Sequence, residues 1–431
     1  MPFPCVDKGI LLDSKPSYQV NKPSSFAALK IPQYRWLFAG NIAFFFAMQG
    51  QILTRSVLAW ELTHRELALA QINLAVAIPM LLGSLVGGAI ADRMEKRKLL
   101  MIGQLFIVAN ECVVLFLLMT GQLEFWNLIV AATLMGFMFP LIMPARMALS
   151  VKVVGKENIG NAMALAVMVL NLARVLGPVC AGLLIGVIDV QGVYVFGIVL
   201  YLVGVACLLG IKPAPPNKDA GNKALLADVK YGFTYLGQNR QILLLLLFGM
   251  VPMFLAMPFQ NLLVVFSDEV WDVGPKGLGF LQGSAGVGGV LGALWVARRG
   301  EQPQRLNGMV LGTVGFGVFL AVFCFIPNFY LALVPLVLAN IFANIASTLN
   351  NTSIQVLVPD EVRGRITSFM LMSFGLMPLG VLPMAYAAER VGAPLAVTVA
   401  SVVMIFAVFV FLLLSGTFRR LDKDLISALE K

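Results

Sequence analysis

The apolar residues of the chain are gathered into long runs that short polar segments separate. A membrane-spanning helix needs about 20 mainly apolar residues, because the hydrocarbon core is ~30 Å thick and a helix rises ~1.5 Å per residue. Twelve runs have this length, so the pattern predicts an all-α integral membrane protein with twelve transmembrane helices. The predicted spans are Trp36–Leu62, Leu67–Ala91, Leu99–Thr120, Phe125–Leu149, Asn158–Ile188, Val193–Ile211, Ile242–Phe266, Gly277–Ala297, Leu306–Ile326, Tyr330–Val356, Arg365–Ala388 and Pro394–Leu414.

Composition supports the same class of protein. Of the 431 residues, 59% are hydrophobic and 12% are charged. A soluble domain carries roughly 25% charged residues, so this chain lacks the charge to cover a water-facing surface. An ordinary soluble enzyme is therefore excluded.

The 31 lysines and arginines are unevenly distributed. Twenty-six fall in the tails or in the loops on the same side as the tails, three fall in the opposite loops, and Arg55 and Arg174 fall within spans. Lys and Arg are enriched in cytoplasmic loops, so both termini are expected in the cytoplasm. The net charge of +9 is then an orientation signal, and no nucleic acid partner is expected.

The longest internal loop divides the spans into two sets of six. We expect residues 1–35 to form a cytoplasmic tail without a cleaved signal peptide, 36–211 the N-terminal six-helix half, 212–241 a cytoplasmic connector, 242–415 the C-terminal half and 416–431 a second cytoplasmic tail. The connector has leucines at helical spacing, which predicts an amphipathic helix. This helix suits either the inner membrane surface or the bundle itself, and the sequence leaves both open.

Charges within spans are rare and costly, at about 2.5–3.5 kcal/mol near the membrane centre on insertion scales, so they are functional candidates. Glu111 in the third span is the one deeply placed acid and the candidate for proton coupling, although it could equally serve a structural ion pair. Two arginines against one acid favour an anionic or carbonyl-rich substrate. Of the two, Arg55 is the candidate for a substrate cavity, while Arg174 could equally be structural.

The loop between the second and third spans resembles the loop signature of the major facilitator superfamily. The matching residues are Gly88, Asp92, Arg93 and Arg97, and Glu95 stands where the family usually has a second glycine. The resemblance implies two pseudo-symmetric six-helix halves and a latch on the cytoplasmic side formed by Asp92 and Arg93.

A second motif, in the fifth span, is similar to the glycine-proline motif of antiporters in this superfamily. It comprises Arg174, Gly177, Pro178 and Gly182. Further segments, Trp60–Thr63 and Val358–Arg365, look like the enterobactin-exporter and macrolide-efflux branch. The resemblance covers about residues 26–415, and it implies export by alternating access with proton antiport.

The tenth span carries a stripe of polar residues on one helical face, which must face protein or water in a membrane. The resemblance puts spans one, four, seven and ten around a central cavity, so the stripe joins Gln51 and Gln260 as candidate substrate contacts. Hydrogen bonding between helices is the alternative. The stripe consists of Asn340, Asn344, Ser347 and Asn351.

These observations favour a monomeric exporter of small amphiphilic molecules in a bacterial inner membrane. We expect a small-molecule substrate and protons as partners and no cofactor or metal. Catalysis is not expected either, since no nucleophile, base and orienting group form a set. The glycines of the eighth span lack the lysine of a phosphate loop and predict close helix packing instead. The alternatives are an importer or lipid-moving member of the superfamily, or a receptor with a degenerate transporter fold.

Overall fold

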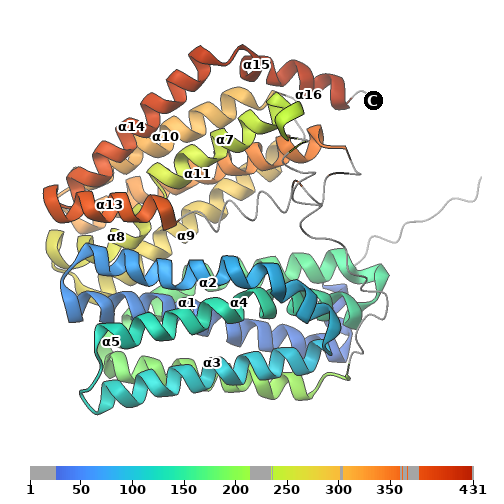
Figure 1. Cartoon of the computed structure of the whole chain (residues 1–431), viewed down its shortest axis with the longest axis vertical. Helices are drawn as coiled ribbons and strands as arrows, with labels where there is room; N and C mark the ends of the chain where they lie inside the picture. The colour runs from blue at the N-terminus through green and yellow to red at the C-terminus, as the bar shows by residue number, and fades with distance from the viewer. Residues whose placement is uncertain are drawn as a thin grey trace, which may run out of the picture.

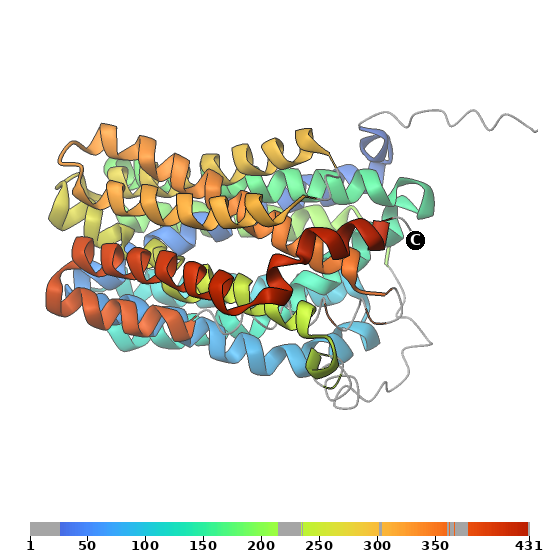
Figure 2. The same cartoon turned by 90° about the horizontal axis from the view of Figure 1, so that it is seen from above.

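The computed structural model describes residues 26–213, 234, 236–300, 304–359, 362, 366 and 378–429, without the side chains of residues 84–93, 156, 378, 417, 419, 424 and 427–429. The regular elements in these ranges are helical, and Figure 1 shows them gathered in two bundles. The predicted all-α, two-half fold is thus confirmed. We call the end of the bundles that carries Pro32 and the C-terminal helix the tail side, and the opposite end the far side (Figure 2).

The N-terminal half is drawn from blue to green in Figure 1. Within it, α1 packs along α5, α2 packs along α4, and α3 contacts both α4 and α5. Its elements are η1 (Ala27–Lys30), α1 (Pro32–Thr63), α2 (Glu66–Arg93), α3 (Lys96–Met119), α4 (Phe125–Val154), η2 (Lys156–Asn158) and α5 (Ile159–Leu209).

The C-terminal half is built on α10 and α11, with α9 packed on α11 and α14 on α10. Pro252 and Pro258 interrupt the predicted seventh span, which is divided into α7 and α8 because proline cannot donate to the helix ladder. The elements are α7 (Arg240–Leu255), α8 (Phe259–Val265), the π-helical turn η3 (Phe266–Val270), α9 (Gly274–Arg299), α10 (Leu306–Phe325), α11 (Phe329–Leu357), α13 (Pro378–Val391), α14 (Ala393–Leu414), α15 (Gly416–Arg419) and α16 (Leu421–Leu429).

Ten helices within the described residues are long and apolar enough to cross a membrane. One of them, α5, has 51 residues and is interrupted at Asp189, whose φ of 57° and ψ of 175° are not helical. At ~1.5 Å per residue it is long enough to cross twice, so its first part (159–188) and second part (190–209) are the fifth and sixth spans. Helix α13 supplies the described portion of the eleventh span, whose beginning lies outside the described residues.

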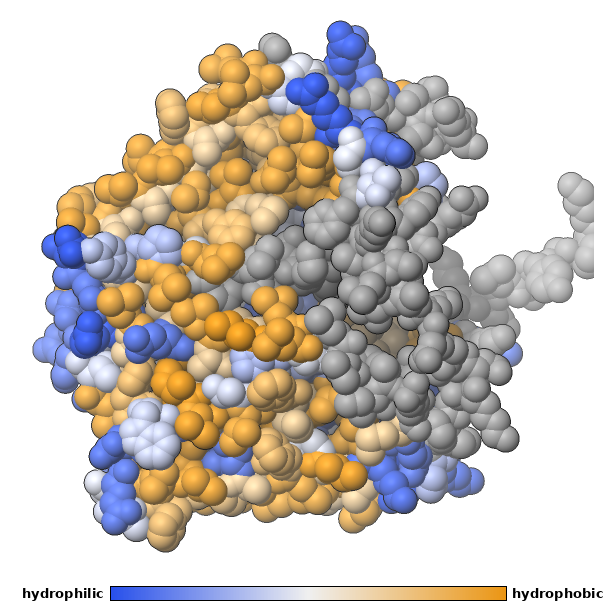
Figure 3. Space-filling view, viewed as in Figure 1, coloured by the Kyte–Doolittle hydropathy of each residue, from blue (hydrophilic) through white to orange (hydrophobic). Residues whose placement is uncertain are grey.

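The surface of the bundles matches a membrane. Figure 3 shows mainly hydrophobic residues over the helices and hydrophilic residues near the two ends. Large apolar side chains point outward, among them Val187 at 77% and Leu414 at 80% exposure. The chain is therefore an integral membrane protein.

The C-terminal segment, expected only as a tail, forms two short helices, α15 and α16, that dock on the bundle. Phe418, Leu421 and Leu425 are fully buried against the tail-side ends of α7 and α11. Phe418 lies in α15, and the four-residue spacing of Leu421 and Leu425 places these two on one face of α16. A carboxylate oxygen of Asp422 accepts the backbone N–H groups of Arg305 and Leu306 at 2.8 and 3.0 Å, so α16 caps the start of α10. The predicted amphipathic connector helix lies mostly outside the described residues.

Candidate functional site

The halves meet where α5 packs on α9 and where α2 packs on α13. At the first seam, a Cβ on Gly182 would lie 2.5 Å from the carbonyl oxygen of Pro275, and a Cβ on Gly279 would lie 2.7 Å from that of Pro178. Only glycine allows backbones this close. The glycine-proline motif thus lies at the contact between the halves, and the predicted close packing of the glycine-rich span is confirmed.

Two hydrogen bonds between side chains join the halves near the far side. The indole N–H of Trp60 in α1 donates to a carboxylate oxygen of Asp268 in η3 at 2.7 Å. The amide of Asn73 in α2 donates to the side-chain oxygen of Asn261 in α8 at 2.8 Å. Both pairs connect residues that are far apart in the sequence, and they hold α1 and α2 against the broken seventh span.

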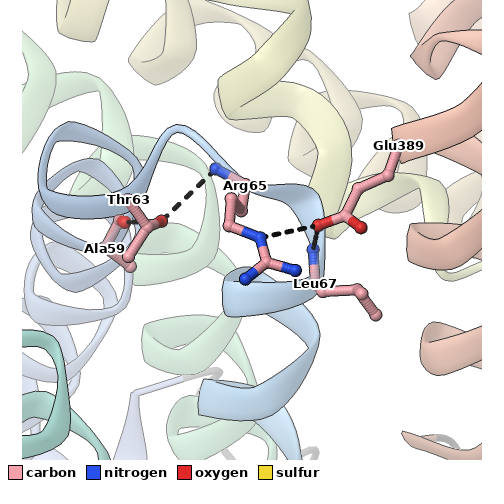
Figure 4. A network of polar contacts seen from close by, with 5 residues as sticks. All are labelled: Ala59, Thr63, Arg65, Leu67 and Glu389. Atoms are coloured by element: carbon pink, nitrogen blue, oxygen red, sulfur yellow. Dashed lines mark hydrogen bonds and ion pairs between the residues drawn. The ribbon is translucent and has the colours of Figure 1, made fainter.

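A third contact lies in the loop between α1 and α2 (Figure 4). The Arg65 Nε donates to Glu389 Oε1 of α13 at 3.3 Å, and the backbone N–H of Leu67 donates to the same oxygen at 3.3 Å. Thr63, which accepts the backbone N–H of Arg65, orders the loop from the N-terminal side. The Arg65 side chain is 65% exposed, so the ion pair alone contributes at most about 1 kcal/mol. We call these three contacts together the far-side latch.

The predicted cytoplasmic gating motif is only partly described. Gly88, Asp92 and Arg93 lie in the segment of α2 whose side chains are outside the described groups, so their role stays a prediction. Arg97, the second residue of α3, donates to the carbonyl oxygen of Leu209, at the end of α5, at 3.4 Å. This contact lies within the N-terminal half.

Arg55 and Glu111 form a buried ion pair inside the N-terminal half. The Arg55 Nη2 donates to Glu111 Oε1 at 2.7 Å, joining α1 to α3. Arg55 is 6% exposed and Glu111 is fully buried. Arg55 therefore faces the interior of this half and not the space between the halves, and its predicted part in substrate binding is untested. Glu111 has the partner that either coupling or a structural pair requires.

Gln51 also points into the N-terminal half. It is 2% exposed, and a Cβ added to Gly197 in the second part of α5 would lie 2.4 Å from its amide nitrogen. The opposite face of α1 carries Gln49, which packs on Gly177, and Ile52, which is 50% exposed. In this conformation the face of α1 that carries Gln49 and Ile52 is turned away from the core of the N-terminal half.

Arg174 lies within a span, as predicted, but it is not buried as Arg55 is. Its side chain is exposed, about halfway along the first part of α5. Its backbone lies at the seam, since a Cβ on Gly286 of α9 would lie 3.2 Å from the Arg174 carbonyl oxygen. A charged side chain exposed at membrane depth must face an aqueous space, because lipid cannot solvate it.

Some residues of the polar stripe of α11 pack against α9, and others are exposed. Asn340 is 7% exposed and donates to the Leu336 carbonyl oxygen at 2.9 Å. The Cβ atoms of Asn340 and Asn344 lie where side chains on two α9 glycines would be, so both residues pack on α9. Ser347 is exposed, as is Gln260 in α8, and Asn351 is half-buried.

A further buried arginine, in α4, was missed. Arg146 was counted with the tail-side charges although the predicted fourth span contains it, and it lies within α4 and is 4% exposed. Its Nη1 donates to Asn41 Oδ1 at 2.5 Å, and its guanidinium lies 4.0 Å from the centre of the Phe44 ring. Twenty-five basic residues thus remain on the tail side, which leaves the charge asymmetry intact.

A sequence profile described as transmembrane secretion effector matches residues 23–430. The enterobactin exporter EntS of Shigella boydii serotype 18 is 27% identical over 316 residues, which are 69% of this chain and 71% of that protein. The multidrug efflux pump Tap of Mycolicibacterium fortuitum is 26% identical over 351 residues, which are 79% of this chain and 82% of the pump.

Solved structures share the fold at lower sequence identity. The nucleoside transporter NupG has a TM-score of 0.71 and 15% identity, with 88% of this chain and 99% of that chain covered. An inward-facing bacterial homologue of the human lysosomal transporter Spinster has a TM-score of 0.67 and 14% identity, with 93% and 98% covered.

Proposed function

Because the chain belongs to the transmembrane secretion effector family of the major facilitator superfamily, we propose that this transporter exports small amphiphilic molecules from a bacterial cell in exchange for protons. The direction rests on the relatives, since one is described as an exporter and the other as an efflux pump. The membrane is the bacterial inner membrane. The tail side is its cytoplasmic side, as the basic residues there favour.

The far-side latch supports a mechanism of alternating access. Bonds that join the halves at the outer end close the route to the exterior. The conformation is then inward-facing, with its substrate space open toward the cytoplasm. Export requires these bonds to break while contacts form on the cytoplasmic side, where the motif with Asp92 and Arg93 lies.

The substrate space is bounded by exposed polar groups from both halves. Arg174 contributes a positive charge from α5, and Gln260 and Ser347 contribute amide and hydroxyl groups from α8 and α11. A guanidinium binds carboxylates and other oxygen-rich groups through paired hydrogen bonds. These groups favour an anionic or carbonyl-rich substrate over a simple cation.

The observation that carries the coupling is the buried Arg55–Glu111 pair. Protonation of Glu111 neutralises the partner of the Arg55 guanidinium, which itself stays charged. Protonation therefore changes the net charge inside the N-terminal half. A buried carboxylate with such a partner is suited to bind a proton in one conformation and to release it in another.

Purified protein in liposomes with an imposed pH gradient tests this function. We expect wild type to transport a catecholate siderophore or a macrolide in response to the gradient, and Glu111→Gln to lose that response. Glu157→Gln, an exposed tail-side carboxylate, is the matched control. A full response in Glu111→Gln would contradict the coupling.

Arg174→Ala should weaken binding of the anionic substrate more than Arg240→Ala, which removes an exposed tail-side charge. Selective movement of cationic dyes by wild type would contradict the substrate class. Accumulation in the opposite direction, in vesicles of known orientation, would identify an importer.

A further inference from the structure

The second part of α5 presents a repeated pattern to the core of the N-terminal half. Tyr194, Gly197, Tyr201 and Gly204 follow one another at intervals of three, four and three residues, which places them on one helical face. All four are buried, and both tyrosines are fully buried. The face thus alternates a phenol with a gap where a glycine has no side chain.

The two gaps are filled by amide side chains from neighbouring helices. A Cβ on Gly197 would lie 2.4 Å from the amide nitrogen of Gln51 in α1. A Cβ on Gly204 would lie 3.3 Å from the amide nitrogen of Gln104 in α3. The glycines therefore admit polar groups into a region that the hydrophobic effect alone would fill with apolar side chains.

Several polar atoms in this region have no hydrogen-bond partner within the described part of the chain. They are both amide atoms of Gln51 and of Gln104, the Tyr201 hydroxyl and Glu111 Oε2. A buried polar atom without a partner is costly, and ordered water commonly satisfies such groups. Six such atoms on three neighbouring helices, α1, α3 and α5, indicate that water lies between these helices.

A pocket adjoins the region at Gln51. It lies between α1 and both parts of α5, and Gln51 is the one polar side chain in a lining that otherwise consists of glycines and apolar residues. Its volume of about 30 Å³ is enough for a water molecule or two, because one water needs roughly 10–15 Å³ by this measure.

The polar groups lead from the ion pair toward the tail side. Glu111 lies 15 residues after Lys96, the first residue of α3, and Gln104 lies 8 residues after it. These separations correspond to depths of ~22 and ~12 Å along the helix axis. Tyr201 lies on the facing helix, seven residues beyond Tyr194, whose hydroxyl is next to the Arg55 guanidinium.

We propose that these side chains hold a file of water molecules that carries protons between Glu111 and the tail side. The inference rests on the proposed proton coupling and adds the route. Glu111 releases its proton to the first water, the waters pass a proton on along Tyr201 and Gln104, and the cytoplasm receives one. The carboxylate that remains keeps its ion pair with Arg55, as in this inward-facing conformation.

The charged and titratable groups along the route favour Glu111 as the site that holds the proton. Arg55 faces Glu111 from α1, Tyr194 and Tyr201 face it from α5, and Arg146 of α4 interacts with Tyr201 near the cytoplasmic end. A proton is repelled by Arg146, so it does not rest beside Tyr201. Glu111 is then the place on the route where a proton is held.

The presence of water in this region can be tested by comparing two buried tyrosines that differ in the hydrogen bonding of their hydroxyl groups. Tyr201 and Tyr34 are both fully buried, but the Tyr34 hydroxyl donates to the carbonyl oxygen of Ala162 at 2.9 Å. Hydroxyl radicals generated by X-ray pulses label side chains that contact bound water. In purified wild type we expect Tyr201 to be labelled at least about threefold faster than Tyr34, because buried water gathers at polar groups that lack a protein partner. Equal labelling would overturn the proposal, whether or not the protein couples to protons.

Transport tests the route itself. In liposomes, Gln104→Leu and Tyr201→Phe should each slow pH-gradient-driven transport by at least about tenfold, since a proton relay loses a member. Substrate exchange without a gradient should fall much less, and Tyr34→Phe should leave both rates near wild type. Unchanged gradient-driven rates in both variants would overturn the route. A wild type without any response to the gradient would instead contradict the proposed coupling, with the labelling result still decisive for the water.

Discussion

The bond between Trp60 and Asp268 offers a direct test of the far-side latch. The indole N–H of Trp60 donates to the carboxylate across the boundary between the halves at 2.7 Å, and Trp60 is 3% exposed. Trp60→Phe removes the donor and keeps most of the aromatic surface. The carboxylate loses its partner only when the far side is closed, so the variant should favour the outward-open conformation.

The size of the shift follows from the kind of bond. A hydrogen bond to a charged group contributes about 1.5–3 kcal/mol, and each 1.4 kcal/mol corresponds to about a factor of ten. Trp60→Phe should therefore shift the equilibrium between closed and open far sides by roughly 10- to 150-fold. A shift of that size is large enough to populate a state that is rare in wild type.

Trp126 supplies the matched control. Its indole N–H donates to Glu124 at the same 2.7 Å, but both residues lie in the N-terminal half. Gln122 and Tyr330 are exposed on the far side, one in each half. Spin labels at these two positions report the opening of the far side through the distance between them, measured by pulsed electron paramagnetic resonance. Trp60→Phe should add a longer distance, and Trp126→Phe should not. Identical distance distributions in the two variants would refute the latch.

Three further predictions concern packing and charge. Gly182→Ala should weaken the seam between the halves by about 1–3 kcal/mol and slow transport, while Gly160→Ala on the same helix, with open space around it, should do neither. Asp422→Ala should lower the free energy of unfolding by about 0.5–2 kcal/mol in thermal denaturation, because α10 loses its cap. Glu111→Leu should lower it by about 3–5 kcal/mol, and adding Arg55→Met should restore most of that loss; a harmless single variant would show that the pair is not buried from water.

The spans could be predicted from the sequence because lipid imposes a simple rule on each of them. A run of about 20 apolar residues is sufficient to identify a span, whatever its neighbours are. The division into halves followed from the long connector, and the family from short motifs. Arg146 was counted with the tail-side charges although the predicted fourth span, Phe125–Leu149, contains it, because an arginine near a span end looks like a loop residue.

The direction in which each polar side chain points could not be predicted in the same way. Arg55 and Arg174 are both arginines within spans, but one is buried against Glu111 and the other is exposed. That difference depends on which helices are neighbours, a three-dimensional property. The alternation of tyrosine and glycine along one face of α5 was present in the sequence and could have indicated a polar region. The partners Gln51 and Gln104 come from other helices and could not be assigned from it.

Helix α5 links the parts of the site that the proposed mechanism must coordinate. Its second part carries the tyrosines that adjoin the Arg55–Glu111 pair, and its first part carries Gly182 at the seam and the exposed Arg174, which we propose as a substrate contact. The two parts are joined directly through the bend at position 189. A change in the charge of Glu111 alters the electrostatic forces on the second part of α5. A displacement of the first part is transmitted to α9 through the backbone contacts at the seam, because the glycines there leave no flexible side chains between the two helices. Proton release and substrate binding can therefore act on the same element, which is what exchange of one for the other requires.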